Sequence, residues 1–257
     1  MIPEFTFHDG HAIPSLGFGT SQIKRADTIL EALRAGYRLI DTAAFYGNER
    51  EVGQAVREAR LPRAEIFITS KVWPDHFGRD ATRKSFDRSL MLLGMDAVEL
   101  FLLHWPGSSD RARLDAWRVL VELKREGRAR SIGVSNHSAD QVSALADATG
   151  IMPVLNQVEL HPLKPQRELR AFHTSHNIVT ESWSPLGRGR MLREPLFAEI
   201  GRAHGRSPAQ ILLRWQVQHG LLPIPKASSF ARMKENLALY DFELSPADMA
   251  KIDALDG

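Results

Sequence analysis

The sequence contains no cysteine. Disulfide bonds, thiolate nucleophiles and cysteine-ligated zinc sites are therefore excluded. It also has no apolar run near the ~18 residues that a membrane-spanning helix requires. Its opening residues, MIPEFTFHDG, lack the basic-then-apolar order of a secretory signal. From these absences we expect a cytoplasmic protein that does not act at a membrane.

Lysine is also scarce, at 8 of the 33 basic residues, in a chain of formal net charge +2 and pI near 9.0. The basic residues are scattered along expected helices rather than clustered, so nucleic acid is not an expected partner. A lysine at the end of an apolar run therefore stands out. Lys71 in IFITSKVW is such a residue, and its side chain must either reach water or be held by a partner.

Short apolar runs alternate with amphipathic segments of period near 3.6 residues along the whole chain. Eight apolar runs, each followed by a helix, predict an α/β fold, a (β/α)8 TIM barrel, in preference to a doubly wound open sheet. No linker or composition shift divides the chain, so we expect one domain, residues 1–257. The expected strands lie in 15–19, 37–41, 66–71, 98–105, 131–136, 155–160, 178–183 and 221–226.

Turn and cap residues support this division of the chain. An alternating stretch around Asp9-Gly10 predicts an N-terminal β-hairpin, which could plug one end of the barrel. The segment 138–150 begins at the N-cap residue Ser138 and ends at Gly150, as a helix does. The segment 207–220 opens with Ser-Pro and closes on a glycine, the usual asymmetry of helix ends.

Polar residues recur at the ends of the expected strands, where the active sites of barrels of this type lie. Each alone has an ordinary explanation: Asp41 as a turn residue, His104 as a hydrogen-bonded loop histidine, Lys71 as a snorkelling lysine. Their joint occurrence favours a site. The residues at the strand ends are Asp41, Lys71, His104, Asn136, Gln157 or Glu159, Trp183 and Lys226.

Three of these side chains, together with Tyr46, suit the reduction of a carbonyl group. Asp41 can pair with Lys71, which offsets the cost of burying either charge. Tyr46 follows the same strand as Asp41, and a nearby ammonium is expected to lower its pKa and make it a better proton donor. His104 can donate a hydrogen bond to a substrate oxygen on which negative charge develops.

The chain resembles the aldo-keto reductase superfamily over nearly its whole length, and most closely its short prokaryotic 2,5-diketo-gluconate reductase-like branch. The resemblance implies a barrel that reduces aldehydes and ketones with NADPH and without a metal, using the tetrad Asp41, Tyr46, Lys71 and His104. The segments that carry it are GYRLIDTAAFYGNEREVGQA, ITSKVW, LLHWP, IGVSNH, NQVELHP, SPLGRG and IPKASSFARMKEN.

The cofactor site is expected along the barrel rim, because no G-x-G-x-x-G dinucleotide motif is present. Trp183 offers a flat face for a nicotinamide. Two cations, Lys226 and Arg232, flank an expected helix N-terminus and favour NADPH, with NADH as a weaker alternative. Ala227 stands where many relatives have a serine, which weakens that preference. With the resemblance, the cofactor residues are Thr20, Asp41, Ser135, Asn136, Gln157, Trp183, Ser184, Leu186, Gly187, Lys226, Ser228, Ser229, Arg232, Glu235 and Asn236.

The substrate pocket is expected to be open, because the chain stops at KIDALDG without the long tail of many relatives. Phe45, Trp73 and Trp105, together with Gln22, are its expected lining. Such a pocket suits small or polar carbonyls, such as keto-sugar acids or methylglyoxal-like compounds. We expect a monomer.

Other chemistries are less favoured. A barrel lysine near an acid also occurs in Schiff-base lyases, which makes Lys71 a candidate nucleophile. A non-catalytic NADPH-sensing subunit would use the same fold. The GVSNH segment misses the last glycine of a nucleophile elbow, so a Ser135 hydrolase is not expected. His173 and His176 are expected to be a solvent-facing pair rather than metal ligands.

Overall fold

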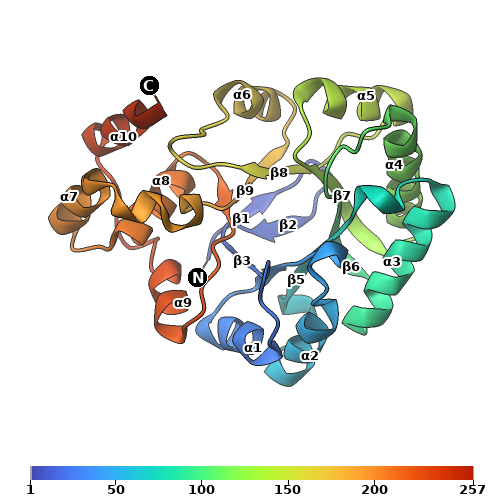
Figure 1. Ribbon diagram of the computed structural model, residues 1–257, viewed down its shortest axis with the longest axis horizontal. Helices are drawn as coiled ribbons and strands as arrows, with labels where there is room; N and C mark the ends of the chain where they lie inside the picture. The colour runs from blue at the N-terminus through green and yellow to red at the C-terminus, as the bar shows by residue number, and fades with distance from the viewer. Residues whose placement is uncertain (1, 257) are drawn as a thin grey trace.

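The computed structural model describes residues 2–256. In this part of the chain, eight parallel strands form one sheet in sequence order, and the helices lie outside it (Figure 1). The predicted (β/α)8 barrel is confirmed. Its strands are β3 (Gly17–Gly19), β4 (Leu39–Asp41), β5 (Phe67–Val72), β6 (Val98–Leu103), β7 (Ala129–Ser135), β8 (Leu155–Glu159), β9 (Val179–Trp183) and β10 (Leu222–Pro223).

The helices follow the strands as the apolar periodicity predicts. Ser138 and Ser207 both form capping boxes, and Gly150 ends its helix in the left-handed conformation. The α-helices are α1 (Ala26–Ala35), α2 (Glu49–Ala59), α3 (Arg79–Leu93), α4 (Asp110–Arg125), α5 (Ala139–Thr149), α6 (Arg167–Ser175), α7 (Pro195–His204), α8 (Pro208–Gln218), α9 (Phe230–Leu237) and α10 (Pro246–Asp253). Short 3₁₀ turns include η1 (Ala44–Tyr46) and η4 (Gly187–Gly189).

The seam between the first and last barrel strands is the weakest part of the sheet. β10 has only two residues, because Pro223 and Pro225 cannot donate backbone hydrogen bonds. One backbone hydrogen bond spans the seam, from Gly19 N to Pro225 O at 3.2 Å. A Cβ atom on Gly19 would lie 2.9 Å from the carbonyl oxygen of Ile224, so glycine permits this close approach. Lys226 therefore lies beyond the last strand rather than at its end, which corrects that detail of the prediction.

The predicted N-terminal hairpin is present. β1 (Glu4–Thr6) pairs antiparallel with β2 (Ala12–Pro14), and the pair crosses the centre of the ring in Figure 1. Phe7 and Ile13 are buried in one cluster with residues such as Leu39 and Phe67, which begin their strands. The hairpin thus covers the N-terminal end of the barrel and leaves the C-terminal ends of the strands open.

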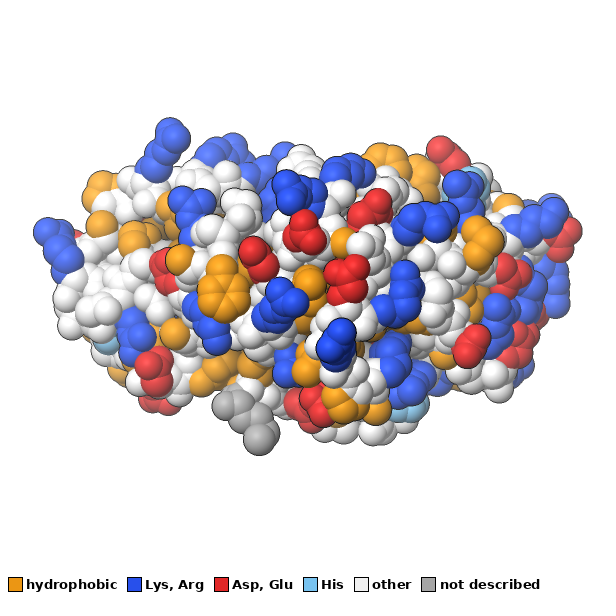
Figure 2. Space-filling view, turned by 90° about the horizontal axis from the view of Figure 1, so that it is seen from below, with side chains coloured by type: hydrophobic (Ala, Val, Ile, Leu, Met, Phe, Trp, Pro, Cys, Tyr) orange, Lys and Arg blue, Asp and Glu red, His pale blue; other side chains and the backbone are white. Residues whose placement is uncertain are grey.

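Basic and acidic side chains are interspersed on the face shown in Figure 2, as the dispersed sequence pattern predicts. Among the described residues, no helix has both the length and the apolar character needed to cross a lipid bilayer.

Candidate active site

A cavity of about 930 Å³ opens at the C-terminal ends of the strands. Its floor is made by residues at the ends of neighbouring strands, and its rim by the loops after β9 and β10. The predicted site residues that line it are Gln22, Asp41, Phe45, Tyr46, Trp73, His104, Trp105, Ser135, Asn136, Gln157, Trp183, Ser184, Leu186, Lys226, Ser228, Arg232, Glu235 and Asn236.

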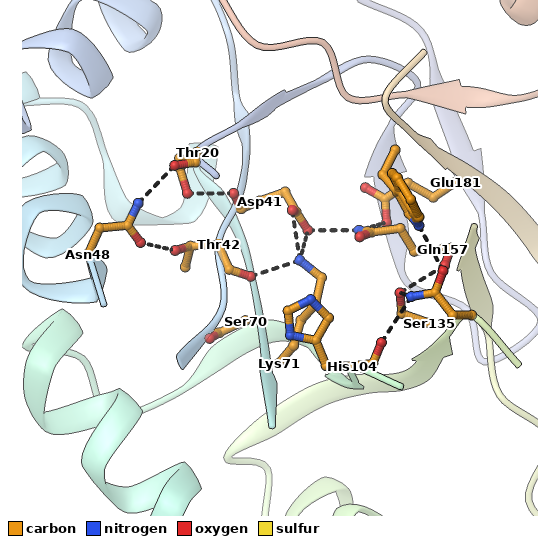
Figure 3. Close-up of polar contacts among 12 residues, drawn as sticks. Thr20, Asp41, Thr42, Asn48, Ser70, Lys71, His104, Ser135, Gln157 and Glu181 are labelled. Atoms are coloured by element: carbon orange, nitrogen blue, oxygen red, sulfur yellow. Dashed lines mark hydrogen bonds and ion pairs between the residues drawn. The ribbon is translucent and has the colours of Figure 1, made fainter. Parts of the chain in front are cut away.

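Lys71 is held by a partner, as predicted. Its side chain is fully buried, and its Nζ donates to both carboxylate oxygens of Asp41 at 2.7 Å and to the carbonyl of Thr42 at 2.9 Å (Figure 3). Burial works to lower the pKa of Lys71, but the charges of Asp41 and Tyr46 act the other way and the pKa is raised. The amine therefore carries its positive charge at neutral pH.

Tyr46 lies beside this ion pair. It ends the 3₁₀ turn η1 after β4, and Lys71 Nζ is 5.2 Å from the centre of its ring. Burial raises the pKa of the Tyr46 phenol above its ordinary value of 10.0, and the charge of Lys71 lowers it only in part. The predicted net lowering of this pKa is therefore wrong, because desolvation outweighs the ammonium. The phenol remains protonated at neutral pH.

His104 directly follows β6, and its ring meets that of Tyr46 edge to face, with centroids 5.5 Å apart. Burial, together with the charge of Lys71, lowers the pKa of His104 to about 2, so the imidazole is neutral. Its Nδ1 is buried without a partner among the described residues, and His104 lines the cavity.

A chain of hydrogen bonds fixes the side chains of Trp183, Asn136 and Ser135 at one end of the cavity. Trp183 Nε1 donates to Asn136 Oδ1 at 2.8 Å, and Asn136 Nδ2 donates to the carbonyl of His104 and to Ser135 Oγ. Ser135 Oγ in turn donates to the carbonyl of Gln157 at 2.8 Å. Asn136 holds a positive φ of 62°. These bonds hold the indole face and the polar groups around it in fixed positions. Such an arrangement suits a flat ligand that carries an amide group.

The other end of the cavity is cationic. Lys226 and Arg232 both line it, on either side of the start of α9. Ser229 caps that helix by accepting a hydrogen bond from the backbone N–H of Arg232. Lys226 Nζ donates at 2.7 Å to Oε1 of Gln22, which lies in the loop after β3. A helix N-terminus with two cations is a favourable place for a phosphate group.

Three predicted cofactor residues do not line the cavity. Thr20 is fully buried and donates to the carbonyl of Asp41 at 2.8 Å. Gly187 lies in the turn η4, where a Cβ atom would meet Met191 at 2.6 Å. Ser229 serves as the helix cap described above. Their contacts with a cofactor stay predictions.

The expected substrate end is aromatic and open. Phe45 and Trp73 are stacked, with ring centroids 3.9 Å apart and planes 17° apart. Phe45 is 60% exposed and Trp105 is 41% exposed. These rings flank the approach to Tyr46 and His104.

Comparison with known proteins agrees with this geometry. The sequence pattern of the Aldo/keto reductase family matches residues 15–257. An aldo-keto reductase of Mycolicibacterium smegmatis is 44% identical over 259 residues, covering 100% of this chain and 94% of the relative. The chain belongs to the aldo/keto reductase family. It is therefore an oxidoreductase by family.

Other members of the family show the range of similar proteins. A 9,11-endoperoxide prostaglandin H2 reductase of Trypanosoma cruzi is 42% identical, covering 98% of this chain and 90% of the relative. The crystal structure of an aldo/keto reductase from Brucella melitensis has a TM-score of 0.97 at 46% identity, with 100% of both chains covered. A variant of Gox0644 in complex with NADPH has a TM-score of 0.95 at 42% identity, covering 100% of this chain and 94% of that one.

Two side chains of this reductase were missed from the sequence. Asn48 is fully buried and joins three segments: it donates to the carbonyls of Thr20 and Ile23 at 2.9 Å and accepts from Thr42 Oγ1 at 2.7 Å. Glu181, on β9, is also fully buried and accepts from Gln157. An acidic residue inside an apolar strand, two residues before Trp183, was the available signal.

The expectation of a solvent-facing histidine pair on α6 is wrong for one of the two residues. His173 is fully buried, and its ring nitrogens contact Thr180 Oγ1 at 2.8 Å and Asn156 Nδ2 at 3.0 Å. Burial lowers the pKa of His173 to about 4, so it packs as a neutral ring. His176 is exposed.

Proposed function

We propose that this reductase converts small or polar aldehydes and ketones to alcohols with NADPH, with Tyr46 as the proton donor. The observation that carries the proposal is a protonated phenol at the floor of a large cavity, beside a buried ammonium and a neutral imidazole. The similarity to a structure in complex with NADPH supports the choice of cofactor.

The side chains divide the work of proton transfer. Asp41 holds Lys71 in place, and the positive charge of Lys71 stabilises the phenolate left when Tyr46 gives up its proton. His104 is neutral and donates a hydrogen bond to the substrate oxygen as negative charge develops there. Tyr46 then delivers its proton to the same oxygen.

The cavity fits the nucleotide in two ways. Trp183 provides a stacking face, and Ser135, Asn136 and Gln157 provide hydrogen-bonding groups for a nicotinamide carboxamide. Lys226, Ser228 and Arg232 lie around the start of α9 and suit the phosphate that distinguishes NADPH from NADH. NADPH, when bound, supplies the hydride that reduces the carbonyl carbon.

The aromatic, open substrate end suits small carbonyls, including keto-sugar acids and methylglyoxal-like compounds. A large rigid substrate would find few walls, since Phe45 and Trp105 are substantially exposed. We further propose that the chain acts as a single-domain monomer.

A Schiff-base lyase is disfavoured by the state of Lys71. Such chemistry needs a neutral amine to attack a carbonyl. All contacts of the Lys71 ammonium, to Asp41 and Thr42, instead stabilise its charged form.

The decisive experiment is a panel of small aldehydes and keto acids with NADPH and with NADH, followed by loss of nicotinamide absorbance. Tyr46→Phe removes only the phenolic hydroxyl group, and with it the transferable proton. We expect its kcat to fall by about 10²–10⁴-fold while NADPH affinity changes by less than about twofold. A Tyr46→Phe protein that keeps full turnover would refute the assigned proton donor. Tight NADPH binding without turnover of any carbonyl would favour a sensing subunit.

A further inference from the structure

Glu181 is a buried carboxyl group that the proposed reaction does not use. It lies on β9 directly opposite Gln157 on β8, is fully buried, and does not line the cavity. Its Oε2 accepts a hydrogen bond from Gln157 Nε2 at 2.8 Å, and its Oε1 is buried without a partner among the described residues. An ionised carboxylate in this position would be costly.

Gln157 links this carboxyl group to the catalytic ion pair. Its Nε2 donates both hydrogens, one to Glu181 Oε2 and one to Asp41 Oδ2, each at 2.8 Å (Figure 3). An amide nitrogen donates and does not accept, so two acceptors beneath it fix which way the amide points. Since Gln157 lines the cavity, this orientation leaves its carbonyl oxygen for a ligand.

The charges around Gln157 are unequal. Two carboxyl groups share a buried space with one ammonium, and Lys71 gives both of its carboxylate contacts to Asp41. Burial, and then the charge of Asp41, raise the pKa of Glu181 to about 8. The titratable groups that act on it come from three elements: Asp41 on β4, Lys71 on β5 and Tyr46 on η1. Protonation of Glu181 leaves the buried network electrically neutral.

We propose that Glu181 is a positioning residue that, as a neutral acid, holds the Gln157 amide so that its carbonyl oxygen accepts from the carboxamide N–H of the nicotinamide. Glu181 acts through Gln157 and touches neither substrate nor cofactor. The identity of the nucleotide rests on the proposed function.

The positioning role is tested by NADPH affinity, measured through quenching of tryptophan fluorescence. Glu181→Met removes the acceptor at similar volume, and we expect the Kd to rise about three- to tenfold, the worth of one hydrogen bond. Glu181→Gln keeps an oxygen that accepts from Gln157, and its Kd at pH 6 should stay within about twofold of the wild type. Equal affinity in all three proteins, or equal loss in both variants, would overturn the proposal.

A double-mutant cycle tests whether the effect passes through Gln157. Gln157→Met should weaken NADPH binding, and adding Glu181→Met to it should cause no further loss. Full additivity of the two losses would overturn the linkage. Glu99→Gln is the matched control: Glu99 is a buried carboxyl group on β6, paired with Arg63 at 2.8 Å, that does not line the cavity.

The protonation state has readouts that need no cofactor. The infrared difference between wild type and Glu181→Gln at pH 6 should contain the carbonyl band of a protonated carboxylic acid, and a carboxylate band there would overturn the proposal. The pKa of Glu181 is about 8 in the folded protein and an ordinary 4.5 in the unfolded chain, so both states hold the proton below 4.5. As pH rises from 4.5 to about 8, the unfolded chain loses this proton while the folded protein keeps it, and the free energy of unfolding falls. The stability that the proton contributes is fully lost once pH has passed about 8. The thermal midpoint of the wild type should therefore fall more between pH 6 and pH 9 than that of Glu181→Gln, and parallel curves would count against it.

These results separate the inference from the proposed function. A wild-type protein that binds NADPH but reduces no carbonyl refutes the function, while the affinity series still tests Glu181. A wild-type protein that reduces carbonyls, with the same affinity and pH behaviour in every Glu181 variant, refutes only the inference. If Glu181→Met does not fold, the infrared spectrum and the pH curves of Glu181→Gln still decide.

Discussion

A single ammonium group sets the behaviour of the residues around it. Lys71 is bound by Asp41 and has a raised pKa, so it is charged at neutral pH. This charge works to lower the pKa of both Tyr46 and His104. It favours the phenolate of Tyr46 and disfavours the imidazolium of His104. The result is one group that can release a proton and a neighbour that stays neutral, which is the division of labour the proposed reduction needs.

The cationic end of the cavity gives a prediction about cofactor choice. Arg232→Ala removes one charged donor near the start of α9, and we expect the Michaelis constant for NADPH to rise about tenfold or more, the worth of ~1.4 kcal/mol. The constant for NADH should change little, because NADH lacks the extra phosphate. Steady-state kinetics with both nucleotides provide the measurement.

The matched control is Lys234→Ala, on the same helix. Lys234 does not line the cavity and lies over the Phe230 ring, 5.8 Å from its centre. Lys234→Ala should leave the Michaelis constant for NADPH within about twofold of the wild-type value. Equal effects of Arg232→Ala on NADPH and NADH would overturn the phosphate assignment.

At the scale of elements, the turn that carries Tyr46 depends on a side chain outside it. Asn48 directly precedes α2, but its side chain makes no cap hydrogen bond to that helix. It instead makes three hydrogen bonds, two to the loop after β3 and one to Thr42, which follows β4. Asn48→Ala removes three buried hydrogen bonds and leaves the Ile23 carbonyl and Thr42 Oγ1 without these partners. We expect the unfolding free energy to fall by about 2–4 kcal/mol. Urea unfolding followed by circular dichroism measures this change.

The control for Asn48→Ala is a serine whose side chain caps a helix. Ser138→Ala removes an exposed capping box on α5, at the end of a loop that does not carry Tyr46, and should cost about 1 kcal/mol. If Asn48→Ala costs no more than Ser138→Ala, the Asn48 bonds do not organise the turn. A larger loss in kcat than in NADPH affinity for Asn48→Ala is expected, because the turn positions Tyr46.

On the scale of the whole molecule, stability and chemistry lie at opposite ends of the barrel. The hairpin β1–β2 covers the N-terminal end, where Phe7 packs against Phe67 with ring centroids 6.5 Å apart. Phe7→Ala should lower the unfolding free energy by about 3–5 kcal/mol. It should leave kcat and the Michaelis constants of the folded protein unchanged, since the cavity is at the other end.

An exposed apolar residue provides the comparison. Met91 on α3 is 69% exposed, and Met91→Ala should change stability by no more than about 0.5 kcal/mol. A Phe7→Ala protein as stable as Met91→Ala would show that the hairpin does not plug the barrel. Altered kinetic constants in Phe7→Ala would contradict the separation of the two ends.

The sequence by itself determined the order of strands and helices, because apolar periodicity and end residues such as Ser138 and Gly150 act over a few neighbouring positions. It also determined which of the tetrad side chains lie at strand ends. The pairing of Asp41 with Lys71 followed from parallel strands placed side by side, without any knowledge of side-chain contacts.

Only the tertiary structure decided the balance between burial and charge. The direction of the Tyr46 pKa depends on how much solvent the whole site excludes, and no local pattern records that quantity. The hydrogen bonds that link Glu181 through Gln157 to Asp41 could not be predicted from local patterns either. They join residues up to 140 positions apart on β4, β8 and β9. Short-range forces set the elements of this protein, and exclusion of water by distant segments sets the charge states of its site.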